Sequence, residues 1–193
     1  MTVDISVDPV KDLAEYATIP IAFMVTCVFD VAVPDNDVSR VVLTERALEH
    51  PYLKDYDTIE NPVSWPNLFD MTHWAIFVAR IEDRRVGGAI VAFDTPGFEM
   101  LEDRTDLAVL WDLRVASEVR NQGVGSALFY AAENWARERG CQRLQVETQN
   151  INVPACRFYA RQGCVLEGVH RDAYPGLPGE IQPWPPPLPA ETC

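Results

Sequence analysis

Residues 107–163 read LAVLWDLRVASEVRNQGVGSALFYAAENWARERGCQRLQVETQNINVPACRFYARQG and decide the fold. The first nine of them are apolar and β-branched enough to form a buried strand. Apolar residues then recur at helical spacing from Val124 to Trp135, and Gly140 supplies a stop. The pattern predicts a strand, a loop and a helix over 125–139. Two glycines, Gly123 and Gly125, stand where the loop enters the helix.

This loop suits a phosphate group. The first N–H groups of a helix have no partners within the helix, and its dipole favours an anion there. Gly123 and Gly125 carry no side chain that would keep a pyrophosphate from those amides, and Arg120 can add a charge-assisted hydrogen bond. The alternative is that both glycines only permit a tight turn. A Walker A loop needs Lys where Ser126 stands, and a dinucleotide fingerprint needs a small residue where Leu128 stands.

Two signatures in this stretch resemble those of the Gcn5-related N-acetyltransferase (GNAT) superfamily. The acetyl-CoA motif, Arg or Gln, two residues, Gly, one residue, and Gly or Ala, is matched by Arg120, Gly123 and Gly125. The second signature, Asn-x-x-Ala-x-x-aromatic-Tyr-x-x-x-Gly, is matched by Asn152, Ala155, Phe158, Tyr159 and Gly163. The resemblance covers roughly residues 70–182. Within it, the chain is similar to bacterial members related to streptothricin acetyltransferases.

The resemblance implies an α/β (α+β) fold, in which a mixed, mostly antiparallel central sheet is flanked by helices and splayed at the acetyl-CoA site. It implies acetyl-CoA as the cosubstrate and no metal. The pantetheine arm would pair with the strand at 107–115 like an extra strand. The residues expected to bind acetyl-CoA are Leu113, Arg114, Val115, Arg120, Asn121, Gln122, Gly123, Val124, Gly125, Ser126, Asn152, Ala155 and Phe158.

Acetyl transfer to an amine needs a base for the amine, donors for the oxyanion and an acid for the departing thiolate. By the resemblance, Tyr159 is the acid, because a phenol near pKa ~10 and a thiol near ~8.5 differ by only about two units. Glu147, twelve residues earlier, has the spacing of a glutamate base in ribosomal-protein acetyltransferases of the superfamily. Asp112 on the central strand is the alternative base. The oxyanion donor is expected to be a backbone N–H near Val115.

Composition and charge limit the classes of molecule that the protein is expected to bind. With 193 residues, 48% hydrophobic and 23% charged, the chain is expected to be one globular domain. Its net charge of −13 argues against nucleic acid and would attract cationic amines, although it also serves solubility. The sequence shows neither a signal-peptide pattern nor an apolar run long enough for a membrane span. Five cysteines without a CxxC pair argue against zinc and for reduced thiols in the cytoplasm.

These features predict an N-acetyltransferase that moves an acetyl group from acetyl-CoA to a primary amine. The preferred acceptor is a cationic small molecule, such as a streptothricin-like antibiotic. A protein amino group is the alternative acceptor, and an acyl-CoA-binding module without turnover is the alternative outside the enzymes. By analogy with the superfamily, the segment 51–69 would form a wall of the acceptor pocket. Its candidate lining residues are Tyr52, Asp55, Tyr56, Asp57, Glu60 and Trp65.

The other elements follow from periodicity and from turn residues. Gly87 and Gly88 indicate a bulge or a close backbone approach at the start of one strand. The segment 51–69 is expected to be an irregular loop with one short helix. A helix is predicted at 41–50, and strands are predicted at 19–33, at 74–81 and 86–93 as a hairpin, at 142–148 and at 164–170.

The end of the chain departs from the superfamily, whose members usually finish with an apolar strand inserted beside the strand that carries the base. Residues 183–193 read PWPPPLPAETC. Their five prolines remove five N–H donors and favour polyproline II. The sequence therefore predicts one acetyltransferase domain over 1–182 and a Pro-rich, non-strand tail over 183–193. The strand near Leu166 would keep a poorly covered edge, which would allow a homodimer.

Overall fold

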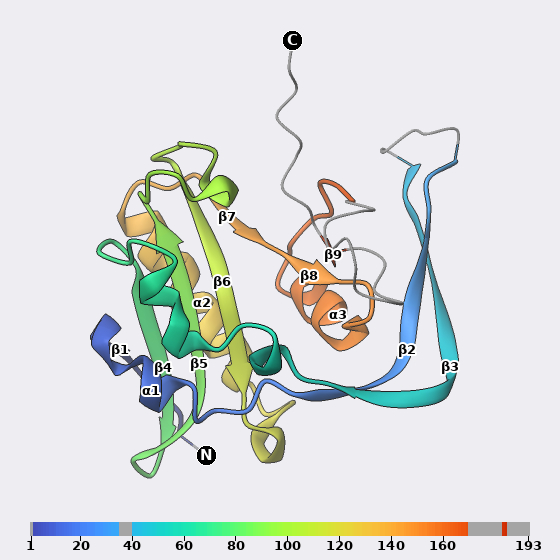
Figure 1. Cartoon of the computed structure of the whole chain (residues 1–193), viewed down its shortest axis with the longest axis horizontal. Coiled ribbons are helices and arrows are strands. Elements are labelled where there is room, and N and C mark those ends of the chain that lie inside the picture. The colour runs from blue at the N-terminus through green and yellow to red at the C-terminus, as the bar shows by residue number, and fades with distance from the viewer. Residues whose placement is uncertain (1, 35–39, 170–182, 185–193) are drawn as a thin grey trace. The chain divides into compact units, whose positions relative to one another are not determined.

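The computed structural model describes residues 2–34, 40–169 and 183–184, and Figure 1 draws it as a ribbon. The chain divides into two compact units. Unit 1 comprises Met1–Ala22 and Asp55–Gln145, and unit 2 comprises Phe23–Lys54 and Val146–Cys193. The chain therefore passes between the units three times, after residues 22, 54 and 145. The single domain expected over 1–182 stays a prediction.

A five-stranded sheet forms the centre of unit 1, in the order β1-β4-β5-β6-β7. Its strands are β1 (Asp4–Asp8), β4 (Ala75–Ile81), β5 (Arg84–Phe93), β6 (Leu107–Val115) and β7 (Arg143–Val146), whose last residue already belongs to unit 2. The pairs β1–β4, β4–β5 and β5–β6 are antiparallel, which confirms the predicted sheet and the β4–β5 hairpin. Glu82 and Asp83 close this hairpin with φ values of 49° and 63°, as a two-residue type I′ turn requires.

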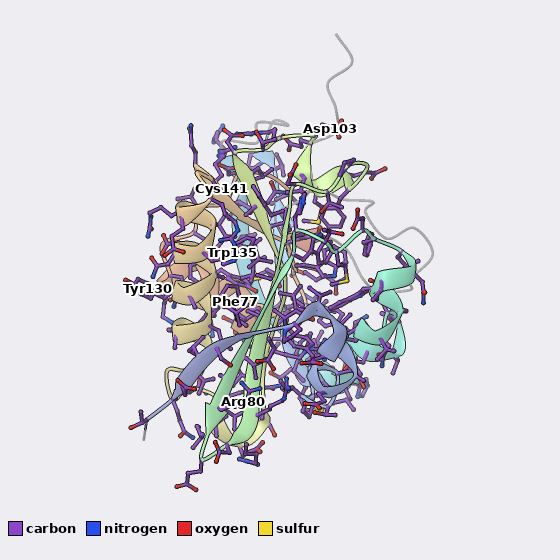
Figure 2. The ribbon with its side chains drawn as sticks, turned by 90° about the vertical axis from the view of Figure 1, so that its left-hand side faces the viewer. Phe77, Arg80, Asp103, Tyr130, Trp135 and Cys141 are labelled. Atoms are coloured by element: carbon purple, nitrogen blue, oxygen red, sulfur yellow. The ribbon has the colours of Figure 1, made fainter. Side chains whose placement is uncertain are left out.

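Helices cover both faces of this sheet, as Figure 2 shows. The long helix α2 (Val124–Glu138) packs on one face, where Trp135 meets Phe77 and Phe93 edge-on at ring-centroid distances of 6.4 and 6.0 Å. The short helix α1 (Leu13–Tyr16) and the 3-10 helices η5 (Pro62–Asn67) and η6 (Glu99–Leu101) cover the other face. Because side chains alternate along a strand, each strand contributes to both layers of the core.

Two glycines of β5 lie where the sheet is tightly held between its two layers. A Cβ on Gly87 would lie 3.1 Å from side-chain atoms of Val124 and Leu128 on α2. A Cβ on Gly88 would overlap the ring of Tyr16 on α1. The pairing of β4 with β5 also shifts by one residue beside these glycines. Both the bulge and the close approach that the sequence indicated are therefore present.

A long antiparallel ribbon of β2 (Phe23–Ala32) and β3 (Val42–Lys54) belongs to unit 2. The strand predicted at 19–33 is confirmed over β2, whereas the helix predicted at 41–50 is wrong. Backbone pairing with β2 outweighs the helical spacing of the apolar residues in this segment. Pro51, the expected end of that helix, lies in a bulge, because residues 48–51 stand opposite Thr26 alone. Proline is tolerated there because a bulge needs no ladder donor from it.

The segment that follows the ribbon is irregular, as the sequence predicts, although residues 51–54 still belong to β3. It forms two short helices rather than one, η4 (Tyr56–Thr58) and η5. Asp55 caps η4 by accepting a hydrogen bond from the Asp57 N–H at 3.1 Å. Asn61 caps η5 by accepting one from the Val63 N–H at 3.0 Å. These local caps explain why a segment with several prolines is ordered.

The remainder of unit 2 contains β8 (Thr148–Gln149), α3 (Val153–Arg161) and β9 (Pro183–Trp184). The strand predicted at 142–148 is interrupted at Glu147. Residues 164–169 form no strand, so that prediction and the exposed edge derived from it are wrong there, while residue 170 lies outside the described residues.

The C-terminal stretch corrects a further prediction. β9 pairs antiparallel with β8, so that Thr148 lies opposite Trp184 and Gln149 lies opposite Pro183. The expected non-strand tail is therefore wrong at residues 183–184. Pro183 is tolerated because it is the first residue of a short edge strand. The rest of the predicted tail, 185–193, lies outside the described residues.

Candidate active site

The loop between β6 and α2 has the backbone geometry of an anion site. After the 3-10 turn η7 (Ser117–Val119), Asn121 and Gly123 take the left-handed conformation, with φ values of 61° and 88°. Gly123 is the N-cap of α2, and no described side chain caps this helix end. The first helical hydrogen bond runs from the Ala127 N–H to the Gly123 carbonyl at 3.0 Å. The amides that precede Ala127 therefore point out of the helix start, where an anion is favoured.

Burial along the loop separates anchoring residues from residues open to a ligand. Val124 is buried under the loop and contacts the sheet at Gly87, while Gln122, Gly123 and Ser126 are exposed. A Cβ on Gly123 would meet no atom within 4 Å, so its left-handed φ, rather than crowding, requires glycine at this position. The residues present thus fit the pyrophosphate of acetyl-CoA. The helix begins at Val124, one residue before the predicted start.

Arg120, the first residue of the acetyl-CoA motif, donates hydrogen bonds from its side chain to backbone carbonyls. Its Nε donates to the carbonyl of Val115 at 2.9 Å, and one terminal nitrogen donates to the carbonyl of Ala22 at 3.1 Å. Burial lowers the pKa of this guanidinium, and the charge of Glu118 partly opposes that effect. The observed contacts of Arg120 therefore hold the loop in place.

A buried cluster of charges lies beside this loop on the α1 face of the sheet. Arg114 binds Asp112 through two hydrogen bonds of 2.9 and 2.8 Å, and Asp112 also accepts a hydrogen bond from the hydroxyl of Tyr16. Both terminal nitrogens of Arg114 reach the carboxylate of Asp57, at 3.1 and 3.2 Å. Burial, followed by the charge of Asp112, raises the pKa of Tyr16 well above its usual value. These hydrogen bonds, together with the buried ring of Tyr16, therefore fix the end of β6.

The sequence reasoning assigned Asp112 and Arg114 to other tasks and missed this cluster. One signal was present, since an Asp and an Arg two residues apart on an apolar strand must share one face. A charge on a buried face almost always has a partner. The partners Tyr16 and Asp57 lie far away in sequence, so local spacing does not reveal them.

A bulge in β6 explains how the side chains of Trp111, Asp112 and Arg114 all lie on the α1 face of the sheet. The pairing with β5 shifts so that Trp111 is the extra residue between Leu110 and Asp112. Trp111 packs against the core cluster on the α1 face, which also contains Tyr16, the partner of Asp112. Bulges turn side chains in this way and occur frequently next to active sites.

The proposed acid and base both belong to unit 2. Glu147 is half-buried at the break between β7 and β8, and Tyr159 lies on α3 with 8% of its surface exposed. Asn152 caps α3 by accepting a hydrogen bond from the Ala155 N–H at 3.2 Å. The rings of Phe158 and Tyr159 lie 5.2 Å apart. The second signature thus begins with a capped helix start and places Tyr159 on a short, ordered helix.

The residues expected to line the acceptor pocket are dispersed in the structure. Tyr52 is exposed on β3 in unit 2, whereas the others belong to unit 1. Trp65 is 4% exposed and packs edge-on against Trp111 at 6.1 Å, which places it in the core. Asp57 is held by Arg114, and one carboxylate oxygen of Glu60 is buried without a hydrogen bond from any described residue. Tyr56 and Asp55 are half-buried.

Two kinds of feature are absent from the described residues. No group of three or more His, Cys, Asp or Glu side chains among the described residues is arranged to hold a metal ion. No helix in the part of the chain that the structure describes is both long and apolar enough to cross a membrane. Cys27, Cys141, Cys156 and Cys164 are thiols, and burial raises the pKa of Cys156 to about 12.

A helix-flanked, mostly antiparallel sheet with an anion-binding strand–loop–helix defines the class of coenzyme A-dependent acetyltransferases. The acetyltransferase (GNAT) family matches residues 43–164. Streptothricin acetyltransferase A of Bacillus subtilis (strain 168) is 29% identical over 151 residues, which cover 78% of this chain and 80% of that protein. Streptothricin acetyltransferase of Escherichia coli is 30% identical over 175 residues, which cover 90% of this chain and 87% of that protein. The chain belongs to the acetyltransferase (GNAT) family and is an acetyl-CoA-dependent N-acetyltransferase.

Two solved acetyltransferase structures have a fold similar to that of this chain. The crystal structure of nourseothricin acetyltransferase is 25% identical, with a TM-score of 0.73 over 95% of this chain and 96% of that chain. A protein from Bacillus anthracis str. Ames, solved in complex with acetyl coenzyme A, is 24% identical with a TM-score of 0.74 over 95% of this chain and 96% of that chain. The predicted fold class is thereby confirmed.

Proposed function

We propose that the chain acetylates a primary amine of a cationic small molecule of the streptothricin class. The observation that carries this proposal is the similarity to two proteins named streptothricin acetyltransferase, one of them 30% identical over 90% of this chain. The net charge of −13 supports it, because an acidic protein attracts protonated amines over distances of about a Debye length, ~10 Å at 0.1 M salt. The proposed homodimer and cytoplasmic location rest on the sequence alone.

The geometry of the β6–α2 loop supports a proposal for where acetyl-CoA binds. We assign its pyrophosphate to the amides of residues 122–126, which the left-handed Asn121 and Gly123 turn toward one side. Its pantetheine arm would pair with the backbone of Leu113, Arg114 and Val115. Asn152, Ala155 and Phe158, at the start of and on helix α3, are also assigned to acetyl-CoA binding. The bound acetyl-CoA supplies the thioester that the amine attacks.

In the proposed reaction, Glu147 accepts a proton from the acceptor ammonium, directly or through one water. The neutral amine nitrogen then attacks the thioester carbonyl carbon, and a backbone N–H near Val115 stabilises the oxyanion that forms. When the carbon–sulfur bond breaks, Tyr159 donates its phenolic proton to the thiolate. As the amide forms, its nitrogen loses a second proton to solvent, and the tyrosinate takes up one proton in return. The products are the acetylated amine and coenzyme A, and the proton held by Glu147 is released as the one net proton of the reaction.

The geometry favours Glu147 over Asp112 as the base. Both oxygens of Asp112 accept hydrogen bonds from Arg114, and one also accepts from Tyr16. Both carboxylate oxygens are thus occupied by hydrogen bonds inside the buried cluster. Glu147 is half-buried and stands at the break between β7 and β8. We therefore assign Asp112 a positioning role.

The experiment measures thiol release from acetyl-CoA in the presence of streptothricin, a neutral amine and a peptide with a free amino terminus. Streptothricin should be acetylated with the highest kcat/KM, with a product heavier by one acetyl group in mass spectrometry. Its kcat/KM should fall as ionic strength rises, because salt screens the attraction. Faster transfer to the peptide would favour the protein amino group instead, and preference for the neutral amine would contradict a cationic acceptor.

A further inference from the structure

Two arginines near the end of β6 hold both ends of the segment that forms the ribbon. This segment leaves unit 1 after Ala22 and returns at Asp55. Before it leaves, Arg114 donates to the carbonyl of Ile19 at 3.0 Å and Arg120 donates to the carbonyl of Ala22 at 3.1 Å. After it returns, Arg114 binds the carboxylate of Asp57 at 3.1 and 3.2 Å. Every one of these contacts lies within unit 1.

Arg114 is the more rigid of the two anchors. Its side chain is 1% exposed, and its guanidinium lies 4.9 Å from the ring centroid of Tyr16. Burial, the largest single effect, would lower its pKa, but the charge and hydrogen bonds of Asp112 together with Tyr16 and Asp57 raise the pKa above the usual value. A buried ion pair gives little net stability compared with apolar residues of the same volume. Its value at this position therefore lies in geometry, since a planar, bidentate cation fixes the directions of its partners.

Arg120 connects the same chain segment to the acetyl-CoA loop. Its Nε donates to the carbonyl of Val115, the last residue of β6, at 2.9 Å. One guanidinium thus joins the end of the central strand to the last residue before the ribbon. The arginine fork can do this because its donors are fixed in one plane.

The two units carry different residues of the proposed reaction. The loop assigned to acetyl-CoA belongs to unit 1, and Glu147 and Tyr159 belong to unit 2. Transfer therefore needs groups from both units, and the chain links the units at three points. Arg114 and Arg120 hold the unit 1 side of two of these three links.

We propose that Arg114 and Arg120 are positioning residues that fix the start and the end of the ribbon segment to the acetyl-CoA end of β6. They thereby restrict the unit 1 ends of the two links that lead into and out of the ribbon. This inference rests on the proposed function, because it takes Glu147 and Tyr159 as the reacting groups. It predicts that loosening one contact lowers turnover while the affinity for acetyl-CoA is kept.

The test replaces Asp57 by Asn, which removes the charge that Arg114 binds and leaves the pair with Asp112. We expect kcat/KM for streptothricin to fall about tenfold, while the Kd for acetyl-CoA, measured by calorimetry, changes less than twofold. Hydrogen exchange of the Ile59 and Glu60 amides, which bond to the Tyr56 carbonyl at 2.9 and 3.0 Å, should become faster. Asp57→Glu keeps the charge and should restore part of the turnover.

Asp106→Asn is the matched control in unit 1. Asp106 binds Arg104 at 2.9 and 3.1 Å at the surface, away from both links, so its loss should change neither turnover nor exchange at Ile59. Equal behaviour of the two variants would overturn the proposal, as would a parallel loss of acetyl-CoA affinity in Asp57→Asn. A parent protein that acetylates no amine would instead refute the proposed function, and the exchange measurement would still test the anchor.

Discussion

Strands β5 and β3 have similar lengths and opposite surroundings. Seven consecutive residues of β5, 86–92, are buried between helices on both faces, whereas Lys54 is the one buried residue among the thirteen of β3. The position of β5 is therefore set by two packed layers. β3 is held by its pairing with β2, by the ion pair of Glu45 with Arg157 on α3 and by the packing of Leu48 against a small apolar cluster. A rigid core suits the loop that we assign to acetyl-CoA.

The largest effect should come from unit 2, at Tyr159. Tyr159→Phe removes the proposed acid while keeping the ring, so we expect kcat to fall by about 10²-fold or more. The affinity for acetyl-CoA should change little, because the ring is kept and the loop assigned to the pyrophosphate belongs to unit 1. Steady-state kinetics with streptothricin, together with calorimetry of acetyl-CoA, separates the two quantities. Full turnover in this variant would remove Tyr159 from the mechanism.

A change in the β6–α2 loop of unit 1 should instead weaken the binding of acetyl-CoA. Gly125→Val places a branched side chain among the amides assigned to the pyrophosphate, so we expect acetyl-CoA to bind about 30-fold more weakly, a cost of about 2 kcal/mol. Gly125→Ala adds one methyl group and serves as the matched control, with a smaller loss. The Kd from calorimetry and the circular dichroism spectrum check binding and fold together. Unchanged affinity in a folded Val variant would refute the pyrophosphate assignment.

The contrast in packing itself can be tested through stability. Gly88→Ala should lower the free energy of unfolding by about 1–3 kcal/mol, because the new Cβ would overlap the fully buried ring of Tyr16. Met24→Ala on the ribbon, at a side chain that is 52% exposed, should stay within about 0.5 kcal/mol of the parent. Urea unfolding measures both.

Combining Gly88→Ala with Tyr16→Leu checks the cause of this loss. The smaller residue removes the overlap, so the two changes should be clearly non-additive. Additive losses, or equal losses in the Gly88 and Met24 variants, would show that the two regions do not differ in packing as described.

The same contrast explains which parts of the structure the sequence predicts. β6 was predicted with its observed ends, Leu107–Val115, because a buried strand needs a continuous apolar run. The helix predicted at 41–50 was wrong because its strand conformation comes from pairing with β2, which local spacing does not encode. For the site, the glycines of the β6–α2 loop were recognisable from their spacing. The partners of Arg114 were not, since Tyr16 and Asp57 lie far away along the chain.

The last prediction concerns Glu147 and gives the smallest effect near neutral pH, about tenfold in kcat/KM for Glu147→Gln. A primary amine titrates near ~10.4, so at pH 7 almost all of the acceptor is protonated and needs a base. As the pH rises toward the pKa of the amine, more of it is neutral and the loss of the carboxylate matters less. The ratio of parent to variant rates should therefore fall toward one between pH 7 and pH 10. Rate profiles with streptothricin measure this ratio directly, and a ratio that stays constant over the range would show that Glu147 is not the base.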